Sequence, residues 1–71
     1  MKATPDNIYE VLNNVCISGK TVSFLQMMDA INASGMKIKN WLKVRGVLQY
    51  MINNNMISRT SDLHVEEYFC A

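Results

Sequence analysis

Residues 44–59 read VRGVLQYMINNNMISR, a stretch that combines a helical pattern, a turn and a strand. Within and just before it, apolar residues recur at the three- and four-residue spacing of a buried helix face: Trp41, Val44, Leu48, Met51 and Ile52. Three asparagines follow at 53–55, and asparagine tolerates the left-handed backbone that closes a helix. Residues 56–59 then favour a strand. The stretch therefore predicts a helix that begins between Ile38 and Asn40, runs to about Asn53, and leads into a strand.

Upstream, the sequence predicts a first helix from Pro5 to Cys16. Thr4 is a good N-cap, and proline is well tolerated at the first helical position because its missing N–H has no intrahelical partner to lose. Its buried side is expected to carry Ile8, Leu12, Val15 and Cys16.

A second helix is predicted to follow Ser23 and to end near Ala33. Ser23 and Gln26 have the spacing of a capping box, in which each side chain satisfies a backbone N–H at the helix start. Gly35 supplies a stop signal. The expected buried side comprises Phe24, Leu25, Met28 and Ile31.

Downstream, residues 60–62 have turn chemistry, and a second strand is expected at about 65–69. Thr21 and Val22 are too few to form a strand alone but can add a short edge to a sheet. The predicted fold class is one mainly α domain over residues 1–71, with three helices and a two-stranded hairpin.

This order of elements resembles the winged-helix family of helix-turn-helix DNA-binding domains. The pattern is carried by Val44, Leu48 and Met51, the asparagine turn, the apolar pair at 56–57, and Arg59. Asparagine stands where the family usually has glycine. The resemblance implies that the third helix is the recognition helix and that the hairpin is the wing. Glu66 and Glu67 make that wing acidic, so Arg59 is its candidate phosphate contact.

The charge is unevenly placed along a chain whose net charge is only +1. Between Ala30 and Ser61 there is no Asp or Glu, while the basic residues there are Lys37, Lys39, Lys43, Arg45 and Arg59. The rest of the chain is acidic. A basic patch on a nearly neutral body suits an anionic partner, although a solvated helix face gives the same pattern.

A helical wheel centred on Val44 predicts which residues of the third helix face outward. The outer residues are Lys39, Leu42, Lys43, Gly46, Gln49, Tyr50 and Asn53, with Arg45 at the border. Lysine and arginine neutralise phosphates, and Gln49 and Asn53 have the amides that pair with an adenine edge. The leading hypothesis is a transcriptional regulator that binds double-stranded DNA through Lys39, Lys43, Arg45, Gln49, Asn53 and Arg59.

The alternative is a winged-helix module that binds another protein without touching DNA. Leu42 and Tyr50 would be its interface, since exposed aromatic anchors are favoured there. The near-zero net charge and the acidic wing favour this alternative. A homodimer is expected in the DNA-binding case, because one recognition helix buries limited surface.

The sequence predicts no enzyme, cofactor or metal site. His64 is the lone histidine, and with Cys16 and Cys70 it lacks the clustered spacing of a zinc site. Cys16 continues an apolar helix face, so we expect it to be a buried free thiol. With no secretory signal or membrane-spanning run in the sequence, a reduced, cytoplasmic protein is expected.

Overall fold

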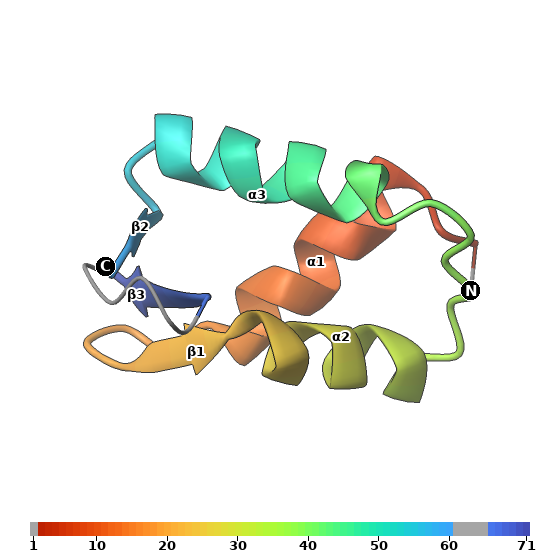
Figure 1. Cartoon of the computed structure of the whole chain (residues 1–71), viewed down its shortest axis with the longest axis horizontal. Coiled ribbons are helices and arrows are strands. Elements are labelled where there is room, and N and C mark those ends of the chain that lie inside the picture. Colours follow the sequence, from red (N-terminus) through yellow and green to blue (C-terminus); the bar gives the residue numbers. More distant parts are fainter. Residues whose placement is uncertain (1, 61–65) are drawn as a thin grey trace.

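Three helices surround one apolar core in the computed structural model, which describes residues 2–60 and 66–71. They are α1 (Pro5–Val15), α2 (Phe24–Ala33) and α3 (Leu42–Asn53). Figure 1 shows α2 and α3 on opposite sides of α1, with the strands gathered at one end of the molecule. This arrangement leaves one side of α3 without a neighbouring helix.

Local sequence signals place the helix starts. The Thr4 hydroxyl accepts a hydrogen bond from the Asn7 N–H at 3.2 Å, and the Ser23–Gln26 capping box forms with both of its bonds. α3 begins slightly later than predicted, at Leu42. The Asn40 side chain accepts a hydrogen bond from the Leu42 N–H at 3.0 Å, and this local bond competes with a helical conformation at residues 38–40. Asn55 takes the left-handed conformation, with φ 59°, so the predicted asparagine stop is confirmed.

The strands form a three-stranded antiparallel sheet in the order β1-β3-β2. They are β1 (Thr21–Ser23), β2 (Ile57–Arg59) and β3 (Glu67–Cys70). The predicted hairpin is confirmed by the register that pairs Ser58 with Phe69, and the short segment at 21–23 adds the third strand by pairing Val22 with Tyr68. The predicted turn at Ser61 and Asp62, and the residues His64 and Val65, lie outside the described part.

The core confirms the phase predicted for α3 and corrects that of α2. Val44, Leu48 and Met51 are buried, whereas Trp41 is only half-buried. Leu25, expected in the core, is 66% exposed, and Met27 takes the buried position instead. Apolar residues occupy most positions of the first two turns of α2, so periodicity alone did not distinguish between adjacent faces.

Both cysteines form a disulfide, so the prediction of a free Cys16 thiol is wrong. Cys16 caps the C-terminus of α1, and Cys70 ends the central strand β3. Their Cα atoms lie 5.6 Å apart, within the range that a disulfide requires. The two residues are 54 positions apart in the chain, and only the packing of α1 beside the sheet brings them together.

Candidate nucleic-acid interface

The outer face of α3 is open to solvent along the whole helix. Lys43, Gln49 and Asn53 are exposed, as the helical wheel predicts, whereas Lys39 is exposed on the segment before α3 and not on the helix itself. Leu42 and Tyr50 share this face and are 70% and 57% exposed. The face therefore combines cations, amides and two large apolar side chains.

Three lysines gather at the N-terminal end of α3. Lys37, Lys39 and Lys43 line a shallow depression of about 170 Å³ together with Ile38 and Asn40. The positive end of the helix dipole lies at the same place, and it also favours anions. Charge and backbone polarity thus point to the same class of ligand at this end.

Two amides stand side by side further along α3. Gln49 Nε2 donates to Asn53 Oδ1 at 2.9 Å, one helical turn away. This bond leaves the Gln49 carbonyl oxygen as an acceptor and an Asn53 N–H as a donor. An adenine edge in the major groove offers the complementary donor and acceptor.

Arg45 is held against the sheet by an ion pair. Its guanidinium donates to both carboxylate oxygens of Glu66, at 2.7 and 3.2 Å, and lies 4.7 Å from the centre of the Phe24 ring. The buried Tyr68 donates its hydroxyl to the same Glu66 carboxylate at 2.8 Å. The predicted phosphate contact Arg45 therefore already has a carboxylate partner.

These contacts shift the pKa values of all three groups. The hydrogen bond from Arg45 lowers the pKa of Glu66, and the same bond raises the pKa of Arg45. Burial raises the pKa of Tyr68, and the neighbouring Glu66 carboxylate raises it further. The three groups thus form one coupled network between α3 and β3. Sequence reasoning missed Glu66 as the partner of Arg45, since the two are 21 residues apart and no local spacing joins them.

The second arginine lies beside this network. Arg59, on β2, lines a small depression of about 90 Å³ between α3 and the sheet, together with Arg45, Gln49 and Tyr68. The structure thus brings Arg45, Gln49 and Arg59 together. Lys43 lies in the first turn of α3, two residues before Arg45, and Lys39 lies on the segment that precedes the helix.

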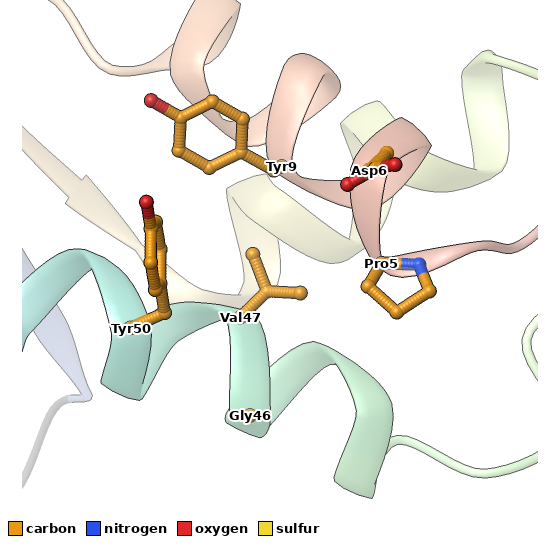
Figure 2. A pocket seen from close by; sticks show the side chains of 6 residues that line it. All are labelled: Pro5, Asp6, Tyr9, Gly46, Val47 and Tyr50. Atoms are coloured by element: carbon orange, nitrogen blue, oxygen red, sulfur yellow. The ribbon is translucent and has the colours of Figure 1, made fainter.

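A groove of about 510 Å³ runs between α1 and α3 (Figure 2). Its lining comes from both helices: Pro5, Asp6, Tyr9, Gly46, Val47 and Tyr50. The rings of Tyr9 and Tyr50 meet edge to face with their centres 5.9 Å apart. Apart from its chain neighbours and the backbone of its own helix, no described residue would contact a Cβ atom placed on Gly46 within 4 Å, so Gly46 leaves open space on the groove wall. Sequence reasoning missed this groove because Asp6 and Tyr9 come from a distant segment.

The described residues include no helix with the length and apolar character needed to cross a membrane. Comparison with known proteins finds no matching family model, no matching curated protein and no matching solved structure.

Proposed function

We propose that this protein is a small DNA-binding transcriptional regulator of the winged-helix type, with α3 as the helix that enters the major groove. The observation that carries the proposal is the exposed surface of α3 and of the segment before it, which presents Lys39 and Lys43 at one end and a pair of amides near the other. The element order and the sheet order β1-β3-β2 are compatible with a winged helix in which the β2–β3 hairpin is the wing.

Different exposed residues make different kinds of contact with the DNA in this proposal. Lys39 and Lys43 neutralise phosphates near the N-terminus of α3, and Arg59 reaches a phosphate from the wing. Gln49 and Asn53 read a base edge. Phosphate contacts set the affinity and position of the protein on the duplex, while the amides supply the preference for one sequence.

Binding titrations of variants on a selected duplex and on random duplexes, at several salt concentrations, test this division. Lys43→Ala should weaken binding to every sequence alike. It should also make the slope of log affinity against log salt concentration shallower by about 1. Lys20→Ala, which removes an exposed lysine outside α3, is the matched control and should change little. Gln49→Ala should cost about 1–3 kcal/mol on the selected duplex and little on random DNA. A wild-type protein that selects no sequence from a random pool at low salt would contradict the proposal.

A protein partner is the second candidate, and the exposed Leu42 and Tyr50 beside an open groove favour it. This reading expects that Leu42→Ala abolishes a complex with another protein while DNA binding stays weak and unspecific. A homodimer is the simplest such complex, and it also suits a palindromic DNA site. Sedimentation at micromolar protein, with and without DNA, tests for it, and a strict monomer in both samples rules it out.

The proposal includes a location for the protein, the cytoplasm. Disulfides are rare in that reducing compartment. The Cys16–Cys70 bond is the observation that counts against this location, and thiol labelling of the protein taken directly from cells tests it. A fully oxidised pair there would contradict the cytoplasmic assignment.

A further inference from the structure

Arg45 lies where it could contact a DNA phosphate, but its guanidinium is already bound to a carboxylate. It borders the exposed face of α3 and, with Arg59 and Gln49, lines the depression between this helix and the sheet. Its guanidinium, however, is engaged through two nitrogens by the Glu66 carboxylate. Carboxylate and phosphate both offer a pair of oxygens to the same planar fork, so the two compete for it.

The Glu66 carboxylate is itself held in place from the sheet. The Tyr68 hydroxyl donates to Glu66 Oε1, the oxygen that also accepts the shorter bond from Arg45. Tyr68 is only 1% exposed, and in the central strand β3 it lies between Val22 of β1 and Arg59 of β2. Its ring therefore has little freedom to move. On the other side, the Phe24 ring supports the guanidinium. Arg45 therefore meets a fixed carboxylate rather than a mobile one.

The Arg45–Glu66 ion pair has a well-defined geometry, but it contributes little to the stability of the folded protein. Both side chains are exposed, at 47% and 36%, and water and salt screen the attraction between exposed charges. A surface arginine that is occupied without a large gain in stability invites a functional explanation.

We propose that Glu66 limits the affinity of this protein for DNA by occupying Arg45, with its carboxylate standing where a phosphate would bind. The inference rests on the proposed function, since it concerns the same face of α3. Arg45 is then a latent cation, and the wild-type protein binds DNA with Lys39, Lys43 and Arg59. Weak general affinity has a use, because it reduces retention on the large excess of non-specific sites.

The test is a salt titration on a random duplex with the wild-type protein and four variants. Glu66→Gln keeps the shape of the side chain and an oxygen that can accept the Tyr68 hydroxyl, but it loses the charged pair with Arg45. If Glu66→Gln frees Arg45 to make one additional phosphate contact, binding should be about eightfold tighter at 0.1 M salt. The slope of log affinity against log salt concentration should be steeper by about 1. Glu67→Gln removes the same charge from the neighbouring residue and is the matched control, for which we expect a smaller gain.

The variants that lack Arg45 show whether the tighter binding expected for Glu66→Gln depends on Arg45. Arg45→Ala alone should bind random DNA within about twofold of wild type, because Arg45 is not in use. In the double variant with Glu66→Gln, the gain should fall to that of Glu67→Gln. A Glu66→Gln gain equal to that of Glu67→Gln, or one that persists without Arg45, overturns the inference while DNA binding itself stands. Failure of every variant to bind, even at low salt, overturns the proposed function and this inference together. Circular dichroism of each variant confirms that the fold is intact.

Discussion

Gly46 lies inside α3, where glycine costs about 1 kcal/mol of stability relative to alanine. No close contact with another element accounts for this cost, because apart from the chain neighbours and the backbone of the same helix no described residue has an atom within 4 Å of a Cβ placed there. The backbone is helical and not left-handed, unlike that of Gly19 and Gly35. The open space on the groove wall is therefore available to a molecule outside the chain.

The substitution Gly46→Ala is expected to separate stability from binding. It should raise the free energy of unfolding by about 0.5–1 kcal/mol in urea titrations, since the added methyl group meets no neighbour. It should also weaken DNA binding if α3 enters the major groove as proposed, because the methyl group would then lie on the face turned toward the duplex. Asn14→Ala, at an exposed position of α1, is the control that should leave DNA affinity unchanged. Equal affinity of Gly46→Ala and wild type would show that no partner approaches closely at this position.

At the scale of elements, the Arg45–Glu66–Tyr68 network joins α3 to β3 and makes the stability of this junction depend on pH. The pKa of Glu66 is lowered by its hydrogen bond with Arg45, so its contribution is present above the ordinary value of 4.5 and is lost as the pH falls through the folded-state pKa. The pKa of Tyr68 is raised by burial and by Glu66, so its contribution is present below the ordinary value of 10.0 and is lost as the pH rises further. Both contributions are present between these two values.

Urea unfolding across the pH range measures this dependence. We expect the free energy of unfolding to fall below pH 4.5 as Glu66 takes up a proton. Glu66→Gln should flatten that part of the curve, whereas Glu67→Gln should leave the Glu66 contribution in place. Identical acid limbs for wild type and Glu66→Gln would mean that the ion pair adds nothing measurable to the junction.

At the scale of the whole molecule, the disulfide ties the end of α1 to the end of β3 and closes a loop over most of the chain. The apolar core of a 71-residue domain is small, so a covalent link is a large share of its stability. Cross-linking residues 54 positions apart reduces the entropy of the unfolded chain, which predicts a gain of roughly 4 kcal/mol.

Reduction of the Cys16–Cys70 bond is therefore expected to lower the free energy of unfolding by roughly 4 kcal/mol. Urea titrations with and without a dithiol reductant measure the difference. The variant in which both cysteines are replaced by alanine should unfold like the reduced protein and should not respond to the reductant. If the reductant leaves the wild-type transition unchanged, the bond is absent from the protein in solution.

The helices of this fold, its hairpin and the exposed face of α3 could be predicted from local sequence patterns. Helix caps such as Thr4 and Ser23 act over three residues, and the stripe Val44–Leu48–Met51 repeats within one helix, so both can be identified without tertiary information. The same local rule identified Lys43, Gln49 and Asn53 as outward-facing, and the structure leaves them exposed.

The contacts between distant segments could not be predicted from local patterns, because they depend on tertiary packing. Tertiary packing paired Cys16 with Cys70, placed Glu66 beside Arg45, and formed the groove between α1 and α3. It also turned Leu25 outward, because the choice between two apolar faces of α2 depends on which one meets the core. Spacing along the chain reports the neighbours of a residue only within one helix or strand, whereas these contacts depend on how the helices pack against each other and against the sheet.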